Sequence, residues 1–196
     1  MACNKSGGGV VLIPSGFWLT GPIELKSNVN LYLQRNALLQ FTADFNEYKL
    51  VEGEWEGVPQ MRNQSPISAT KAVNIAITGN GIVDGNGDAW RAVKKDKLSE
   101  TQWKKLVASG GMTSTDGKTW YPSEKSFKGS KMSNAGYISP EKNAAYYEEI
   151  KDFLRPNMIL LTGCKKVLLE GVTFQNSPAW NLHPLMCEDL TVRNVY

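Results

Sequence analysis

Two stretches near the end of the chain share one pattern: residues 164–172 read CKKVLLEGV and residues 187–195 read CEDLTVRNV. An offset of 23 residues aligns cysteine with cysteine and apolar residue with apolar residue, in the pairs Cys164 with Cys187, Val167 with Leu190, Leu169 with Val192 and Val172 with Val195. Alternating apolar positions that recur at a fixed period are typical of a β-solenoid. We therefore expect short strands that stack from coil to coil about 4.8 Å apart.

The alternation also occurs in the first half of the chain. An offset of 44 residues aligns three apolar positions with three others, in the pairs Val29 with Val73, Leu31 with Ile75 and Leu33 with Ile77. We interpret this offset as two coils of about 22 residues, so the repeat is expected to cover most of the chain. Residues 44–64 are charged and aperiodic, and this segment is expected to be a loop that leaves one coil.

The middle of the chain carries helical signals instead. Ser99 with Gln102 forms a capping box. Ser139 followed by Pro140 predicts the N-cap and first position of a second helix, which is expected to cover residues 142–154.

Between these helices, residues 110–136 are rich in Gly, Ser, Thr and Lys and are expected to be a loop. The strand pattern resumes at Met158. We therefore predict one domain over residues 1–196, with a mostly helical, Lys-rich insertion at residues 90–155.

The net charge of +3 is too small to argue for a nucleic-acid partner. The segment from Arg91 to Lys151 holds twelve Lys and Arg against seven Asp and Glu, and it is either a solvated helical surface or a basic wall that faces a polyanion. No apolar run approaches the roughly 20 residues that span a bilayer. No export signal follows Met1, and we expect no membrane partner.

The three cysteines cannot all pair within one chain. Cys164 and Cys187 occupy equivalent positions of adjacent coils, where they form either a stack of buried thiols or a disulfide between coils. The only histidine, His183, is not at ligand spacing from a cysteine pair, so we predict no metal site and no cofactor.

Several motifs, in this order and spacing, resemble glycoside hydrolase family 28, the polygalacturonase family. The matching pieces are GGGVV at 7–11, GPI at 21–23, LKSNV at 25–29, GIVDGNG at 81–87 with Trp90, Arg155-Pro156, and Asn176-Ser177-Pro178 with Trp180, His183 and Pro184. The likeness covers nearly the whole chain outside the insertion.

The resemblance implies an all-β fold, a right-handed parallel β-helix, and hydrolysis of α-1,4-galacturonan with inversion. It also implies catalytic aspartates in Asn-Thr-Asp and Gly-Asp-Asp motifs, followed by Gly-His-Gly and Arg-Ile-Lys, and none of these four motifs occurs in the chain. In the family the first motif follows the coil matched by residues 187–195. We therefore expect a β-helix incomplete at its C-terminus, a fragment that begins after the family's usual start and that has no catalytic residue or activity of its own.

The resemblance further implies a parent enzyme that is monomeric, secreted or periplasmic, and acts on an acidic plant polysaccharide, namely pectin or polygalacturonate. A chain that stops at Tyr196 would expose strand edges, so we expect it to be poorly soluble or to self-associate. The basic insertion could attract such a polyanion. Endo and exo action are equally compatible with the sequence.

The candidate substrate-binding residues lie in the segment from Asn176 to Pro184, which we interpret as a loop-like break between strands. His183 either lines the cleft as a hydrogen-bonding group or is a packed or solvated residue. Trp180 either stacks on a sugar ring or makes a core contact. Asn176 is interpreted as a turn residue in preference to a ligand of the sugar. Asp84, in a Gly-flanked turn, is interpreted as a residue that bonds its own backbone.

Two other functions remain open. The first is a non-catalytic β-helix that binds an acidic polysaccharide through the basic insertion and the Trp180–His183 segment. The second is a β-helix hydrolase for rhamnogalacturonan or xylogalacturonan. The preference for galacturonan follows from the family resemblance alone.

Overall fold

The computed structural model describes residues 2–196, which form two compact units. The strand unit contains the residues up to Glu47, Ser65–Gly87 and Asn157–Tyr196, and the insertion unit contains Tyr48–Gln64 and Asp88–Pro156. Each unit is described separately below.

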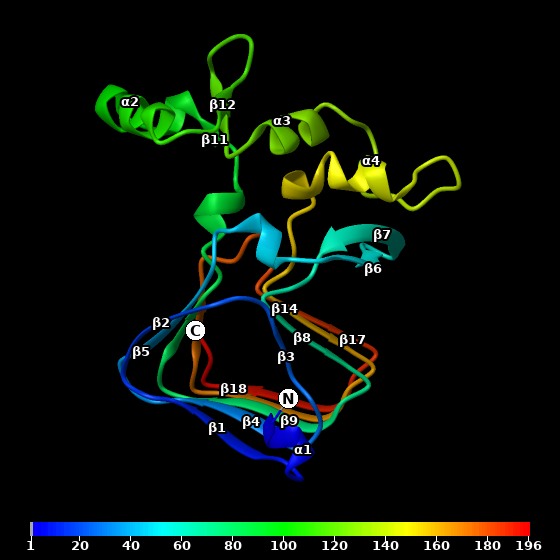
Figure 1. Ribbon diagram of the computed structural model, residues 1–196. Coiled ribbons are helices and arrows are strands. Elements are labelled where there is room, and N and C mark those ends of the chain that lie inside the picture. Colours follow the sequence, from blue (N-terminus) through cyan, green and yellow to red (C-terminus); the bar gives the residue numbers. More distant parts are fainter. Residues whose placement is uncertain (1) are drawn as a thin grey trace. The chain divides into compact units, whose positions relative to one another are not determined.

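The strand unit consists of three parallel sheets (Figure 1). The first sheet has the order β1 (Gly9–Ile13), β4 (Val29–Leu33), β9 (Val73–Gly79), β15 (Lys165–Glu170) and β18 (Glu188–Arg193). The second has the order β2 (Gly16–Thr20), β5 (Ala37–Phe41), β10 (Ile82–Asp84) and β16 (Thr173–Gln175). The third has the order β3 (Ile23–Glu24), β8 (Ile67–Thr70), β14 (Ile159–Thr162) and β17 (Leu182–Leu185). The short helix α1 (Ala2–Lys5) and the 3-10 turn η1 (Phe45–Glu47) complete the unit.

The chain visits the three sheets in turn, so each strand pairs with its equivalent in the next round. The prediction of a mostly β chain with parallel sheets is confirmed. The predicted offset of 23 residues is also confirmed, because Val167 pairs with Leu190 and Leu169 pairs with Val192. Connections from the second sheet to the third lie at residues 42–66, 85–158 and 176–181. The strands where they begin are hydrogen-bonded neighbours in the second sheet, and the strands where they end are hydrogen-bonded neighbours in the third.

The predicted offset of 44 residues is wrong. Leu31 pairs with Ile77 rather than with Ile75, so the offset is 46, and β4 is a direct neighbour of β9. These strands are therefore one round apart, not two, and that round is enlarged by residues 48–64. Side chains alternate with a period of two, so a shift of two residues leaves the apolar pattern unchanged and the sequence could not reveal it.

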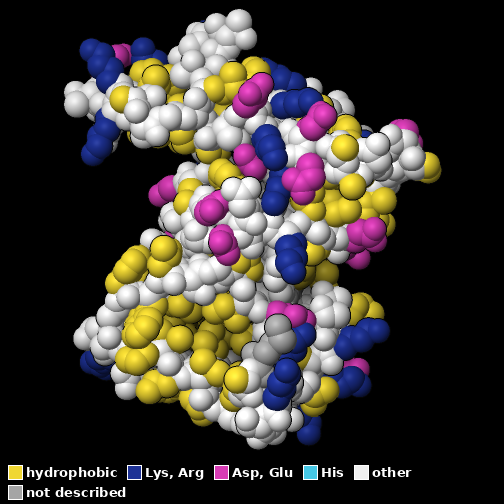
Figure 2. Space-filling view, viewed as in Figure 1, with side chains coloured by type: hydrophobic (Ala, Val, Ile, Leu, Met, Phe, Trp, Pro, Cys, Tyr) yellow, Lys and Arg dark blue, Asp and Glu magenta, His cyan; other side chains and the backbone are white. Residues whose placement is uncertain are grey.

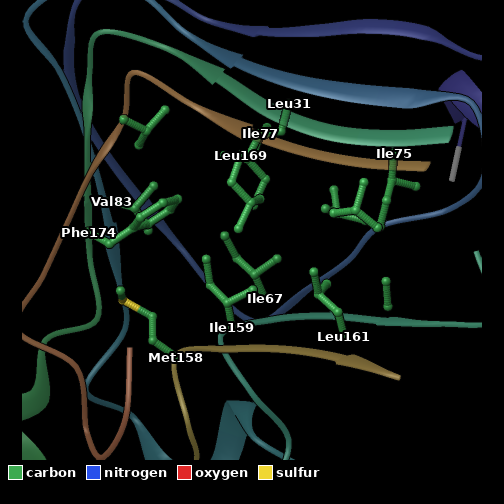
Figure 3. Close-up of a cluster of buried hydrophobic side chains, with 14 of the residues drawn as sticks. Leu31, Ile67, Ile75, Ile77, Val83, Met158, Ile159, Leu161, Leu169 and Phe174 are labelled. Atoms are coloured by element: carbon green, nitrogen blue, oxygen red, sulfur yellow. The ribbon is translucent and has the colours of Figure 1, made fainter. Parts of the chain in front are cut away.

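Apolar side chains from all three sheets point into one interior (Figure 3). Ile77 of the first sheet, Phe174 of the second and Ile67 of the third meet there, together with Met158. Fully burying such a side chain contributes about 1.5–3 kcal/mol. Stacked rounds thus bury faces that a single round would expose.

Cys164 and Cys187 are both free thiols, so the disulfide alternative is wrong. Cys164 is fully buried and Cys187 half-buried within the same apolar cluster. Burial raises the pKa of the Cys164 thiol, because the thiolate would lose its hydration there. The two cysteines therefore pack as small apolar residues.

The corners of the rounds repeat a left-handed backbone. At the turn after the third sheet, the three stacked positions all have positive φ, namely Lys71, Gly163 and Met186. The same is true within the first sheet at Asn74, Lys166 and Asp189. Only glycine, and to a lesser degree asparagine, adopts this conformation without strain. The backbone conformation at such a position is therefore determined by the stacking of the rounds, and residues other than glycine adopt positive φ there.

The insertion unit combines a hairpin, a small sheet and short helices. Its strands are β6 (Leu50–Trp55) with β7 (Val58–Asn63), and β11 (Val93–Lys94), β12 (Met112–Thr113) and β13 (Thr119–Tyr121). Its helices are α2 (Glu100–Ala108), α3 (Glu124–Ser130) and α4 (Ala144–Glu148), with the 3-10 turns η2 (Gly87–Trp90), η3 (Lys95–Lys97) and η4 (Lys151–Phe153). A second apolar cluster forms around Tyr147, Ile150 and Leu154.

Three expectations for this unit require correction. Residues 44–64 contain the antiparallel hairpin β6–β7 rather than a loop, closed by a two-residue turn in which Glu56 and Gly57 both have positive φ. The helix over residues 142–154 is interrupted between α4 and η4, and its cap is Asn143. Residues 110–136 contain β12, β13 and α3.

The capping box at Ser99 is confirmed: its hydroxyl accepts from the Gln102 amide, and the Gln102 side chain accepts from the Ser99 amide. The predicted cap, Ser139, is wrong: the N-cap of α4 is Asn143, whose carboxamide oxygen accepts the Tyr146 N–H at 3.0 Å. A side-chain acceptor three residues before a free N–H is the determinant of a helix start. Both serine and asparagine satisfy it, so the sequence allowed either position.

Acidic side chains lie among the basic ones of the insertion unit. Lys95 pairs with Glu100 at 3.1 Å, and Lys128 pairs with Glu149. Figure 2 likewise shows Asp and Glu side chains interspersed with Lys and Arg on the visible face. These pairs favour the interpretation of a solvated surface over that of a continuous basic wall.

Within residues 2–196, none of the helices has the length and apolar character that crossing a bilayer requires. The same described residues hold no cluster of three His, Cys, Asp or Glu side chains placed to coordinate a metal ion.

Candidate functional site

Asp84 is the centre of a hydrogen-bonded turn in the strand unit. Its carboxylate accepts the Asn86 N–H at 2.7 Å, the Gln175 Nε2 at 2.8 Å and the Asn176 Nδ2 at 3.3 Å. Asp84 is 6% exposed. A buried carboxylate with three donors is a stable structural element, and the interpretation of Asp84 as a turn residue is confirmed.

Gly85 and Gly87 allow the connection that begins at residue 85 to contact the backbone of the 176–181 connection. A Cβ added to Gly87 would lie 2.2 Å from the carbonyl oxygen of Ser177, and one added to Gly85 would lie 2.8 Å from that of Asn176. The Gly87 N–H donates to the Asn176 carbonyl at 2.7 Å. Only glycine fits at both positions, so this turn fixes the start of the 176–181 connection.

The 176–181 connection is held at both ends. Asn176 has φ 51°, a left-handed backbone typical of a turn, and its side chain is turned to Asp84. Ser177 donates its hydroxyl to the Trp180 carbonyl at 2.9 Å, and the same carbonyl accepts the Met158 N–H at 2.9 Å. A short connection with this many internal bonds presents its side chains in a defined position.

His183 is oriented by Asn157. The Asn157 Oδ1 accepts the Trp180 N–H at 3.3 Å, so its Nδ2 is the donor in the 2.9 Å contact with His183 Nδ1. An Nδ1 that accepts is unprotonated, which places the proton of the neutral ring on Nε2. In this tautomer the Nε2–H of His183 is a hydrogen-bond donor.

Trp180 and His183 form one aromatic pair. Their ring centroids are 5.4 Å apart and the planes meet at 74°, an edge-to-face arrangement. Trp180 is 42% exposed, and His183 is half-buried. A partly exposed indole beside a fixed N–H donor matches the two needs of a sugar, whose ring has an apolar face and whose edge carries oxygens.

The sequence interpretation of this region needs one correction and one addition. His183 and Pro184 lie on β17, in parallel pairing with β14, and not in a loop. β17 is the end strand of its sheet within the described residues, a place where a proline is tolerated. Asn157 was missed, although it lies one 23-residue period before Trp180, so the repeat itself could have revealed it.

The structure brings the candidates together in two groups. Asn176 belongs to the Asp84 turn, whereas Trp180 and His183 form the aromatic pair. The only carboxylate bonded within these groups is that of Asp84. The groups brought together here are an indole, an imidazole and one carboxylate, whereas glycoside hydrolysis by acid–base chemistry uses a pair of carboxyl groups.

Comparison with known proteins gives a consistent result. No family model matches the chain. The chain is 24% identical to a probable polygalacturonase of Vitis vinifera over 98% of its own length and 30% of the relative. A hyperthermoactive exopolygalacturonase from Thermotoga maritima matches with a TM-score of 0.65 and 28% identity, over 99% of this chain and 40% of that one.

A family 28 exopolygalacturonase of Yersinia enterocolitica matches with a TM-score of 0.61 and 19% identity, over 95% of this chain and 32% of that one, and supports the fold alone. The chain thus spans less than half the length of each of these proteins.

Proposed function

We infer that this chain, which is related to the polygalacturonases of glycoside hydrolase family 28 over nearly its whole length, is part of a pectin-degrading hydrolase. Three parallel sheets visited in a fixed order support a parallel β-helix, and the twist of β-strands favours the right-handed crossover. Residues 90–155 are an insertion in one such domain, because β10 and β14 on either side continue the same sheets.

The observation that supports a sugar-binding role is the contact between the Trp180 and His183 rings. The indole face would stack on a pyranose ring, and the His183 Nε2–H would donate to a hydroxyl or carboxylate oxygen. Asn157 keeps the histidine in the donor tautomer. The proposed substrate is α-1,4-galacturonan, whose repeating carboxylates supply such acceptors.

Inverting hydrolysis requires an acid and a base carboxyl about 6.5–9.5 Å apart across the scissile bond. Asp84 is occupied by three donors, and the sequence contains neither Asn-Thr-Asp nor Gly-Asp-Asp. These 196 residues therefore supply binding groups without the catalytic pair. We expect no release of reducing ends by this chain on its own.

Pectic polymers are too large to enter a cell intact, so the enzyme would act in the periplasm or outside the cell. The non-catalytic alternative is favoured by one observation, the absence of the catalytic motifs from the sequence. It differs from the preferred function only in what the remainder of the protein contributes.

Binding to polygalacturonate tests the site. The chain is titrated with size-fractionated polygalacturonate by isothermal calorimetry, and reducing ends are measured on the same samples. Trp180→Ala is expected to weaken binding about fivefold, since covering the exposed part of this indole contributes on the order of 1 kcal/mol. Trp18→Ala is the matched control, because Trp18 is also a strand-unit tryptophan and is 43% exposed.

Two further variants separate the roles of the pair. His183→Gln keeps a side-chain N–H donor and is expected to bind better than His183→Ala. Equal loss in Trp18→Ala and Trp180→Ala would contradict the site, and release of reducing ends by the unmodified chain would contradict the absence of catalytic groups.

A further inference from the structure

One pocket of the insertion unit has a volume of about 830 Å³, within the range of about 300–1,000 Å³ that is usual for drug-sized ligands. Its wall is contributed mainly by α2, by the turn η3 and by the strands β11 and β13. On α2, Gln102, Lys105 and Leu106 are spaced so that they share one face of the helix, and the C-cap Ser109 continues this face. The helix packs through Trp103, its buried residue, and lines the pocket with a different face.

Apolar side chains make up much of the wall. Val93, Leu98 and Leu106 are partly buried, and Trp120 is 8% exposed. The Trp120 indole N–H donates to the Gly110 carbonyl at 2.8 Å, so the ring offers a ligand its carbon surface and not its donor. A ligand with an apolar body would cover these side chains and bind through the hydrophobic effect.

The uncharged polar side chains of the wall are also engaged. Gln102 Oε1 accepts the Ser99 N–H at 2.9 Å, and the Ser109 hydroxyl donates to the Leu106 carbonyl at 2.7 Å. A sugar requires several hydrogen-bonding partners, because each of its hydroxyls loses water on binding. The pocket therefore suits an apolar ligand better than a carbohydrate.

The net charge of the wall is positive. Its charged side chains are those of Asp88, Arg91, Lys94, Lys97 and Lys105. Arg91 donates to Asp88 at 2.7 Å, so this pair contributes no net charge. Within residues 2–196, no ion pair engages Lys97 or Lys105. Around α2, Lys and Arg side chains flank apolar ones on the visible face (Figure 2).

Lys94 contributes less to this positive charge. It also lines a neighbouring pocket, whose wall includes the carboxylates of Asp96, Glu100 and Asp116. Negative charge is therefore already close to Lys94, whereas none of these three carboxylates lines the pocket beside α2. An anion in that pocket is attracted chiefly by the two other lysines.

We propose that this pocket binds a medium-chain fatty carboxylate. Its hydrocarbon tail packs on Leu98, Leu106 and Trp120, and its carboxylate lies at the ammonium groups of Lys97 and Lys105. The tail is aliphatic because the one aromatic ring of the wall is nearly covered. This site lies outside the sugar site proposed above, and the inference does not rest on the proposed function.

Indole NMR signals test the proposal on the full chain. Each of the six tryptophans of the ¹⁵N-labelled chain gives one indole N–H signal, and that of Trp120 is assigned from Trp120→Phe. The probes are octanoate, 1-octanol, which has the tail without the charge, and acetate, which has the charge without the tail. Octanoate is expected to shift the Trp120 signal saturably, 1-octanol to bind about tenfold more weakly, and acetate to cause no shift.

Two lysine variants test the charged end of the site. Lys97→Gln and Lys105→Gln are each expected to weaken octanoate about threefold, since an ion pair to an exposed lysine contributes a factor of about 1.5–5 in affinity. The double variant should lose about tenfold and approach the affinity for 1-octanol. Lys104→Gln is the matched control, because Lys104 is an exposed lysine of α2 outside the pocket wall.

Equal affinity for octanoate and 1-octanol, or equal loss in Lys104→Gln and the double variant, would overturn the proposal. So would a Trp120 shift by D-galacturonate as strong as that by octanoate, which would make this a sugar site. Tighter binding of 1-naphthoate than of octanoate would reject the fatty tail. Sedimentation with phosphatidylglycerol vesicles, without a Trp120 shift by octanoate, would assign this surface to a membrane instead. None of these results depends on binding of polygalacturonate.

Discussion

Replacing Asp84 tests whether this carboxylate is structural. In Asp84→Ala the Asn86 N–H, the Asn176 amide and the Gln175 amide all lose their acceptor. Gln175 is exposed and can turn to water, whereas the other two donors lie in the packed turn. Two lost bonds to a charged group at about 1.5–3 kcal/mol each give a destabilisation of about 3–6 kcal/mol.

Asp84→Asn should cost less, about 1–2 kcal/mol, because one oxygen remains and the exposed Gln175 amide can rotate to accept the new NH₂. Stability is measured by urea denaturation followed by far-UV circular dichroism. Amide hydrogen exchange at Asn86 provides a local measurement, since its protection should fall in both variants. The reasoning would be refuted by two variants of parental stability, or by Asp84→Asn being the less stable of the two.

Three other changes test separate features. Met186→Gly should raise the melting temperature by about 2–4 °C, because this 89% exposed residue has φ 51° and a left-handed L-residue costs about 1 kcal/mol more than glycine; unchanged melting would contradict the strain. Cys164, whose thiol pKa is raised by burial, should resist Ellman's reagent at pH 8 in the native chain and react in urea, while half-buried Cys3 reacts natively; rapid native labelling of Cys164 would oppose this. Ser99→Ala should destabilise α2 by about 1 kcal/mol, seen as faster amide exchange in that helix but not in α3, and equal effects on both would exclude a local cap.

The sequence revealed those features that local chemistry determines. The 23-residue offset predicts the pairing of Val167 with Leu190, because the sequence itself shows both the period and the alternation of apolar residues. The Asp84 turn follows equally from an aspartate followed by Gly85-Asn86-Gly87, whose carboxylate reaches the amide two residues on. In each case the interacting groups are close in sequence or separated by a clear repeat.

Features that lack a local sequence signal, or that join distant segments, were missed. The offset between Leu31 and Ile77 was misjudged by two residues because alternation is blind to such a shift. The β6–β7 hairpin was hidden because Glu56 occupies a turn position where asparagine or aspartate gives the usual signal. The contact between Asn157 and His183 joins two rounds, so neither residue indicates it alone.

The connections between the second and third sheets have a practical consequence for protein engineering. Residues 85–158 form a connection about twelvefold longer than residues 176–181, yet both join strands in the same stacking register. By loop-closure entropy such a difference costs only about 2 kcal/mol, because the cost grows with the logarithm of length. The stacking of the strands therefore does not depend on the length of the connection between them. At these connections a segment can be shortened, or a new binding element inserted, without redesign of the parallel sheets.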